Sequence, residues 1–149
     1  MMSMTSLKEL LVNDGFEQTV SDTAAFISAT VNKQSGLTGV ALKGALAAAT
    51  KVDSDILTKG SRRLLPELAD SLDGLWQEYS AGDGTDFGSY LSGNSDRALD
   101  AILGVADRNA DSISVPGLAK VYRGVRGKAA KVIEEELPEI GALVQKHAA

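Results

Sequence analysis

Apolar residues recur at helical spacing along almost the whole chain, and no run of alternating β-branched residues interrupts them. In the clearest example, a helical wheel places five apolar residues on one narrow face: Phe16, Val20, Ala24, Ile27 and Val31. Helix start signals agree with this spacing, since Ser6 and Glu9 form a capping-box pattern around the start of LKELL. Periodicity of this kind is typical of amphipathic helices. We therefore expect an all-α protein.

The chain has 149 residues, close to the commonest length of a single domain. Caps and periodicity together predict a bundle or array of about eight helices joined by short connections. The order of features repeats between residues 6–82 and 86–148, where SLKELL and LPELADSL correspond to DFGSYL and LPEIGALV. Two related four-helix halves are one interpretation. The other is that helical proteins reuse the same caps and Leu-Pro starts. Pro66 is expected to begin a helix, because proline fits the first turn.

The glycine-rich stretch GLTGVALKGALAAATKV, residues 36–52, is the most tempting enzyme motif. Gly39 and Gly44 have the spacing of a phosphate-binding loop, but the lysine and hydroxyl residue that should follow Gly44 are missing. The stretch is also too short to span a bilayer, and it contains Lys43. Because a helix that is apolar almost all round is usually buried, we expect this segment to be the central helix of the core.

Composition narrows the classes of partner. The net charge is −5 and the pI is near 4.8, which disfavours indiscriminate binding to nucleic acid or to an anionic membrane. Cysteine is absent, so disulfides and thiolate chemistry are excluded. The first residues show neither the basic region nor the continuous apolar region of a signal peptide. We expect a cytoplasmic protein with no membrane partner, no nucleic-acid partner and no cofactor.

No catalytic or metal-binding motif stands out in the sequence. The single histidine, His147, lies near the C-terminus, and we expect its side chain to be solvated because chain ends fray. With one histidine and no cysteine, a zinc site would need carboxylates at ligand spacing, which the sequence does not show. We expect no enzymatic activity and no bound metal.

Two aromatic residues, Trp76 and Tyr79, lie one turn apart among leucines. The simplest interpretation is core packing, with the indole N–H and the phenol O–H reaching the rim of the core. The alternative is a pocket between helices lined by Trp76, Tyr79 and Tyr122, which would suit a small-ligand carrier or an enzyme. A closed cavity lined by these aromatic residues would favour the alternative.

The most unusual feature of the sequence is a basic segment without acids. Five basic residues and no acidic residue lie between Asp111 and Glu134. A charge run of this kind is most often a solvated helix face. Two glycines, Gly124 and Gly127, fall on the same outward side, although each costs about 1 kcal/mol in a helix interior. This coincidence is the basis for predicting a contact surface.

Arginines on such a surface can bind carboxylate or phosphate groups through two hydrogen bonds. The predicted function is therefore a non-enzymatic binding or scaffold module. Its partner would be an acidic protein, a second copy of the chain or a phosphate-bearing ligand. The candidate contact residues are Lys120, Arg123, Gly124, Arg126, Gly127 and Lys131.

Six segments taken in order, SLKELL, SGLTG, LLPELAD, DFGSYL, VYRGVRGKAAK and LPEIGALVQKHA, resemble a family of small all-helical bacterial proteins of unknown function, of actinobacterial type. The resemblance covers residues 6–148. It supports a single domain, and it implies no activity, cofactor or catalytic residue.

Overall fold

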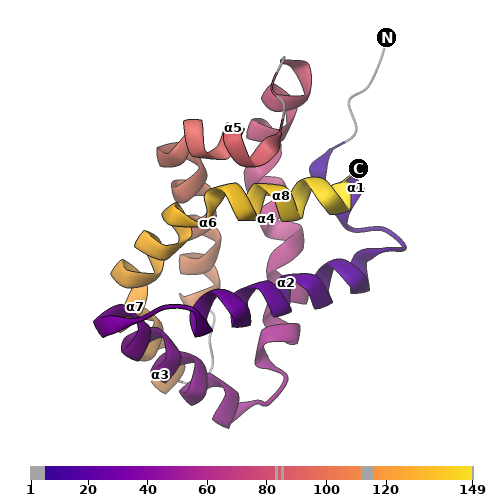
Figure 1. Cartoon of the computed structure of the whole chain (residues 1–149). Helices are drawn as coiled ribbons and strands as arrows, with labels where there is room; N and C mark the ends of the chain where they lie inside the picture. The colour runs from indigo at the N-terminus through magenta and orange to yellow at the C-terminus, as the bar shows by residue number, and fades with distance from the viewer. Residues whose placement is uncertain (1–5, 83, 85, 112–115, 149) are drawn as a thin grey trace.

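The computed structural model describes residues 6–82, 84, 86–111 and 116–148, and these residues form eight α-helices and no strand (Figure 1). In chain order the helices are α1 (Leu7–Leu11), α2 (Phe16–Asn32), α3 (Gly36–Val52), α4 (Ile56–Ala81), α5 (Phe87–Gly93), α6 (Ser95–Asp111), α7 (Pro116–Glu135) and α8 (Leu137–Ala148). The all-α prediction is confirmed. A duplication relating residues 6–82 to 86–148 stays a prediction.

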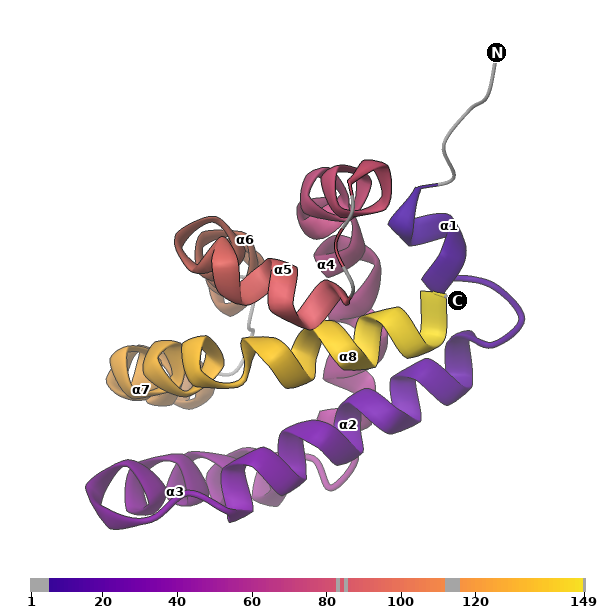
Figure 2. The same cartoon turned by 45° about the horizontal axis from the view of Figure 1, so that its top comes forward.

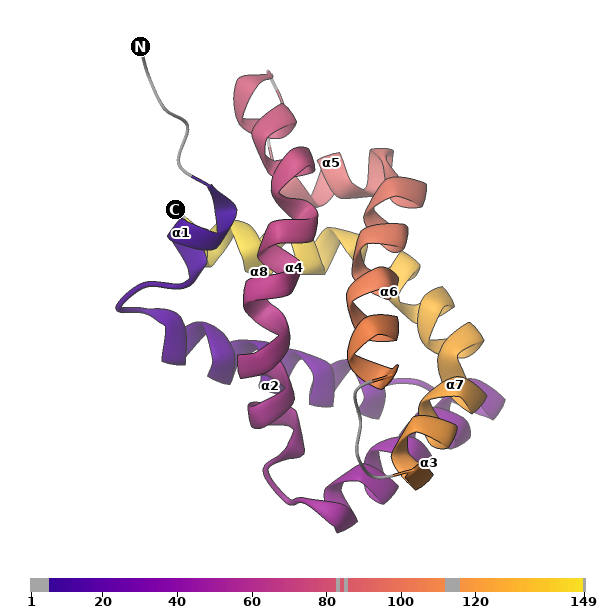
Figure 3. The same ribbon diagram turned by 180° about the vertical axis from the view of Figure 1, so that it is seen from behind.

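The longest helix, α4, forms the centre of the molecule. It lies beside α6, and α2 and α8 cross it on one side (Figures 1 and 3). The short helix α5 lies across α8, and α1 packs on both α4 and α8. At one end of the molecule α3 and α7 pack against each other (Figure 2). A partly open apolar pocket lies between α2, α4, α6, α7 and α8.

The two shortest helices both begin at side-chain caps. At the start of α1, the Ser6 hydroxyl accepts a hydrogen bond of 3.1 Å from the Glu9 amide, as the capping-box pattern predicts. At the start of α5, the Asp86 carboxylate accepts one of 2.7 Å from the Ser89 amide. Such caps satisfy amide groups that have no partner within the helix.

The packed core lies around α1, α4, α5 and α8. Leu7, Phe87 and Leu91 are among its largest fully buried side chains. The crossing of α5 and α8 is close because glycines meet there: a Cβ atom on Gly141 would collide with the backbone of Gly88. The two backbones therefore touch without intervening side chains.

The prediction that residues 36–52 form the central helix of the core is wrong. The segment is helical, but α3 lies at the periphery, with Gly39 and Leu42 as its buried residues. Leu37 is 83% exposed and Val40 is 73% exposed. The physical reason is side-chain size, because nearly half of the residues of α3 are glycine or alanine, whereas the leucines of α4 fill more volume at the centre.

The prediction that Pro66 begins a helix is also wrong, because Pro66 lies inside the continuous helix α4. Proline removes one backbone hydrogen bond and usually kinks or ends a helix. Its neighbours Leu65 and Ala69 are buried, and α4 packs against α1, α2 and α6. This tertiary packing outweighs the local preference of proline for the first turn.

Candidate functional site

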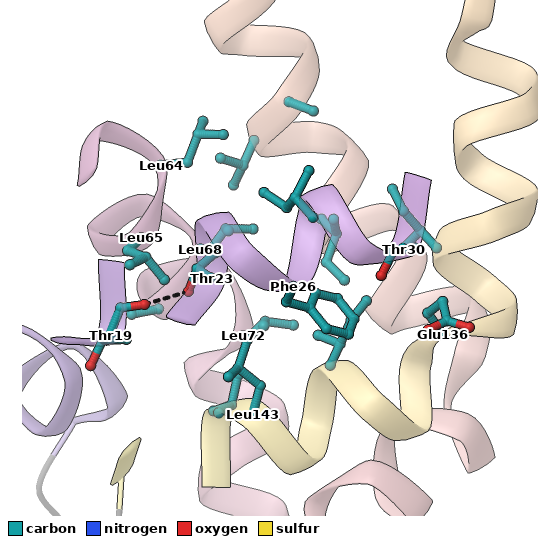
Figure 4. Close-up of a pocket in the computed structure, with 18 of the residues that line it drawn as sticks. Thr19, Thr23, Phe26, Thr30, Leu64, Leu65, Leu68, Leu72, Glu136 and Leu143 are labelled. Carbon is teal, nitrogen blue, oxygen red and sulfur yellow. Dashed lines mark hydrogen bonds between the residues drawn. The ribbon is translucent and has the colours of Figure 1, made fainter. Parts of the chain in front are cut away.

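An apolar cavity of about 340 Å³ lies between α2, α4, α6, α7 and α8, with smaller contributions from α1 and α3 (Figure 4). None of its lining residues is exposed. The leucines of α4 that line it are Leu64, Leu65, Leu68 and Leu72. Pockets for small molecules have volumes of roughly 300–1,000 Å³ and mostly apolar walls. The cavity therefore has the size and surface of a ligand site.

The wall formed by α2 contains threonines, yet it presents almost no polar surface to the cavity. The Thr19 hydroxyl donates a hydrogen bond of 3.2 Å to the Gly15 carbonyl, and the Thr23 hydroxyl donates one of 2.8 Å to the Thr19 carbonyl. Both hydroxyl groups are thus satisfied by the backbone of their own helix. Thr19 and Thr23 consequently add volume to the wall without adding a free polar group.

One charged side chain, Glu136, lies at the edge of the cavity. Figure 4 shows it on the side of Thr30, at the opposite end from Leu65. The Lys33 Nζ atom lies 2.8 Å from Glu136 Oε1, and the Glu136 side chain is 14% exposed. A second hollow of about 330 Å³ adjoins this edge and shares Phe26, Thr30 and Glu136 with the cavity. Glu136 and Lys33 therefore mark where the cavity approaches the surface.

The end of α8 is fastened to α2 beside this cavity. The prediction that His147 is solvated is wrong, because its side chain is only 11% exposed and its Nε2 lies 2.8 Å from Asp22. A hydrogen bond from Gln18 lowers the pKa of Asp22 below its usual range, and His147 and Lys146 lower it further. The C-terminal helix is thus held against one cavity wall instead of fraying.

The predicted pocket residues Trp76 and Tyr79 lie elsewhere. Their ring centroids are 5.5 Å apart, and Trp76 packs edge-on against Phe87 at 4.9 Å. Tyr79 also lies near Tyr90, with the two ring planes tilted and the centroids 6.0 Å apart. These rings cover the packed core at the α4/α5 side, as the simpler interpretation of core packing predicts.

The third predicted pocket residue, Tyr122, is not part of that aromatic cluster. Its hydroxyl donates a hydrogen bond of 2.7 Å to Asp107, and Arg126 donates two of 2.8 Å to the same carboxylate. The hydrogen bonds from Arg126 and Tyr122 lower the pKa of Asp107 to about 2. Burial and the contact with Asp107 raise the pKa of Tyr122 to about 12. The structure therefore does not bring Trp76, Tyr79 and Tyr122 into one pocket.

The predicted contact residues all lie on α7, and five of the six are exposed: Lys120, Arg123, Gly124, Gly127 and Lys131. A Cβ atom on Gly124 or Gly127 would meet no atom within 4 Å. Arg126 differs from the others, because its guanidinium group is held by Asp107 of α6. The outward side of α7 is therefore open, but Arg126 serves the contact between α6 and α7.

The residues that line the cavity were not identified from the sequence. A usable signal was present, because Thr19, Thr23 and Thr30 fall on one side of the helix, next to the apolar stripe. Threonines in such a position are usually assigned to a solvated edge. Only their closeness to α4 and α8 shows that they form a wall.

Within the described residues, no group of three His, Cys, Asp or Glu side chains lies close enough to hold a metal ion. None of the helices in that part of the chain combines the length and the hydropathy that a transmembrane span requires. Among the described lining residues, Glu136 is the one titratable side chain. The cavity wall thus offers hydrophobic contact and a single ion pair at its edge.

Residues 7–148 match the sequence pattern of a family of unknown function, DUF6918. The chain belongs to this family. No curated protein matches the chain, and no solved structure matches it. The matched region runs from α1 to α8, so the whole cavity lies within the part that defines the family.

Proposed function

We propose that this protein is a cytoplasmic, non-enzymatic carrier that binds an apolar small molecule, or the apolar part of a larger one, in the cavity between α2, α4, α6, α7 and α8. The observation that supports the proposal is a volume of about 340 Å³ with almost entirely apolar walls. Water in this space finds almost no hydrogen-bond partners on the walls. The natural occupant is a hydrophobic ligand.

The size of the cavity gives a second argument. Unfilled volume beside a packed interior lowers stability in proportion to its size, and this space measures about 340 Å³. The net stability of a domain is only about 5–15 kcal/mol. A ligand that fills the space restores part of this loss, and ligand binding and folding are therefore expected to be coupled.

The lining supports binding without catalysis. Glu136 is its one titratable side chain in the described residues, and Lys33 holds it in an ion pair at 2.8 Å. General acid or base catalysis needs a proton-transfer group within reach of the substrate and a site that stabilises developing charge. Aliphatic walls supply neither, whereas they suit storage or transport of a hydrophobic molecule.

The experiment combines native mass measurement with thermal unfolding. The freshly purified protein is expected to retain a small molecule, and dodecanol is the defined apolar probe for the emptied protein. At a hundredfold excess over Kd, a ligand stabilises the folded state by about 2.7 kcal/mol. For a chain of this length, that stabilisation raises Tm by roughly 5–10 °C.

A pair of cavity-filling substitutions locates the binding site. Ala106→Leu with Ala129→Leu places side chains into the cavity, and should reduce or abolish the rise in Tm caused by dodecanol. Ala47→Leu with Ala142→Leu makes the same chemical change at exposed positions and should leave that rise intact. A protein with no retained ligand and no response to dodecanol would disprove the proposal, as would an equal response in both double variants.

A further inference from the structure

Positive charge is concentrated on the adjacent helices α3 and α7. Seven of the fifteen basic residues of the chain lie on these two helices. No acidic residue occurs in residues 36–52 or 116–133. All 20 acidic residues of the chain lie outside these two ranges. The net charge of −5 is therefore the sum of a positively charged part and a more strongly negative remainder.

The basic side chains of these two helices also differ from the others in their contacts. Elsewhere in the described part of the chain, every lysine and arginine has a partner, such as Asp70 for Lys8 and Glu78 for Arg97. The basic side chains that have neither an ion pair nor a hydrogen bond among the described residues are Lys43, Lys51, Lys120, Arg123, Lys128 and Lys131. All six are exposed. We call these six residues the free cations.

Three large exposed apolar side chains lie on α3, the helix that also carries the free cations Lys43 and Lys51. Leu37 is 83% exposed, Val40 is 73% exposed and Val52 is 55% exposed, and all three lie on α3. The fourth large hydrophobic residue that is exposed in the described part of the chain, Val12, is 37% exposed and lies after α1. The same helix pair thus presents unneutralised cations and large apolar side chains to its surroundings.

We propose that α3 and α7 form a surface that docks on an anionic lipid bilayer. The free cations would contact the phosphate groups of the lipids, and Leu37 and Val40 would enter the boundary between headgroups and acyl chains. Helices that lie at a membrane surface combine these two features, and anionic lipids attract each nearby lysine or arginine. The expectation of no membrane contact rested on the overall charge, and the distribution of charge reverses that argument.

Other occupants fit the surface less well. Specific protein interfaces are depleted in lysine and enriched in aromatic residues, whereas the exposed residues of α3 include two lysines and no aromatic residue. A second copy of the chain would bring its own free cations against these. Nucleic acid would pair with the cations but offers little to Leu37 and Val40. A lipid surface satisfies both kinds of side chain.

The two helices of the docking surface also contribute residues to the cavity, on their buried sides. Leu42 of α3 and Val132 of α7 both line the cavity, while Val40 and Lys131 on the same helices are exposed. Docking through α3 and α7 would therefore place the cavity one helix away from the lipid. The inference stands without a cavity ligand, because it rests on charge and exposure alone.

The test is flotation with vesicles of phosphatidylcholine and phosphatidylglycerol in a 7:3 ratio at low salt, compared with vesicles of phosphatidylcholine alone. Lys43→Gln with Lys131→Gln removes two free cations and should weaken binding to the anionic vesicles roughly 30-fold. Lys8→Gln with Lys146→Gln changes the net charge by the same amount at paired positions and should have little effect. Leu37→Ser with Val40→Ser should weaken binding roughly tenfold or more.

Failure to float with anionic vesicles would overturn the proposal. It would also be overturned if the two glutamine pairs weakened binding equally, or if the serine pair had no effect. A duplex DNA or polyglutamate competitor that binds more tightly than the vesicles at equal charge would indicate a nucleic-acid or acidic-protein partner instead. Circular dichroism of each variant establishes that the exposed substitutions leave the helices intact.

Discussion

Glycines occupy two very different surroundings in this protein. At the α5/α8 crossing, a Cβ atom on Gly88 would collide with the Pro138 carbonyl, and one on Gly141 with the backbone of Gly88. On α3 and α7, a Cβ atom on Gly44 or Gly124 would meet no atom within 4 Å. Glycine lowers helix stability by about the same amount everywhere. At the crossing that loss is offset by backbone contact, whereas at Gly44 and Gly124 it is not, so the role of a helical glycine depends on what faces it.

A second comparison involves two carboxylates with the same kinds of partner. Asp107 binds a tyrosine and an arginine of α7, and Glu78 binds a tyrosine of α5 and an arginine of α6. Hydrogen bonds from the arginine and then the tyrosine lower the pKa of each carboxyl group to about 2. The surroundings differ, because α5 is also held by its crossing with α8, whereas α7 packs on the peripheral helix α3. Loss of the carboxylate hydrogen bonds is therefore expected to loosen α7 more than α5.

The largest effect is expected from adding a methyl group at the crossing. Gly141→Ala should destabilise the protein by about 3 kcal/mol, since over-packing of this kind costs roughly 1–3 kcal/mol and the clash here involves rigid backbone. The matched control is Gly44→Ala, which should stabilise by up to about 1 kcal/mol because the site is open. Urea denaturation measures both. Equal effects at the two positions would remove the distinction between the regions.

An intermediate effect is expected on α7. Gly124→Ala with Gly127→Ala should raise the free energy of unfolding by up to about 2 kcal/mol, because both positions are open and alanine is the better helix former. Thermal unfolding of the isolated protein is the measurement. A loss of stability would show that another element covers these glycines and that α7 is buried like the crossing.

The smallest effect concerns pH. A folded-state pKa of about 2 for Asp107, against an ordinary value of 3.8, stabilises the protein above about pH 4, and this contribution is lost as the pH falls toward 2. Asp107→Asn should remove that part of the acid sensitivity and increase hydrogen exchange in α7. Glu78→Gln should alter the same pH range but leave exchange in α5 low. Faster exchange in α5 than in α7 would contradict the comparison.

Much of the fold could be predicted from the sequence, because helix formation is governed by local patterns. The Ser6 cap and the helical stripe from Phe16 to Val31 lie within single helices, and both describe the structure correctly. Predictions from local patterns were wrong where tertiary contacts determine the structure. Pro66 lies inside a helix because packing on both sides outweighs its local preference.

The candidate site could not be predicted, because its walls come from helices far apart in the sequence. Thr23, Leu68 and Leu143 lie close together only after α2, α4 and α8 have packed. Trp76 and Tyr122 were predicted to line a pocket, but Trp76 packs against Phe87 and Tyr122 hydrogen-bonds to Asp107. A cavity forms in the space between helices, so the sequence pattern of a single helix does not predict it.

The sequence by itself determined that this chain is helical, that it lacks cysteine chemistry, and that its basic residues cluster between Asp111 and Glu134. These properties depend on composition and on neighbours within a few turns. The tertiary structure alone decided that the apolar helix α3 is peripheral, that α4 is central and that an apolar volume remains between the helices. The physical reason is that burial depends on which large side chains compete for the same space, and that competition involves every helix at once.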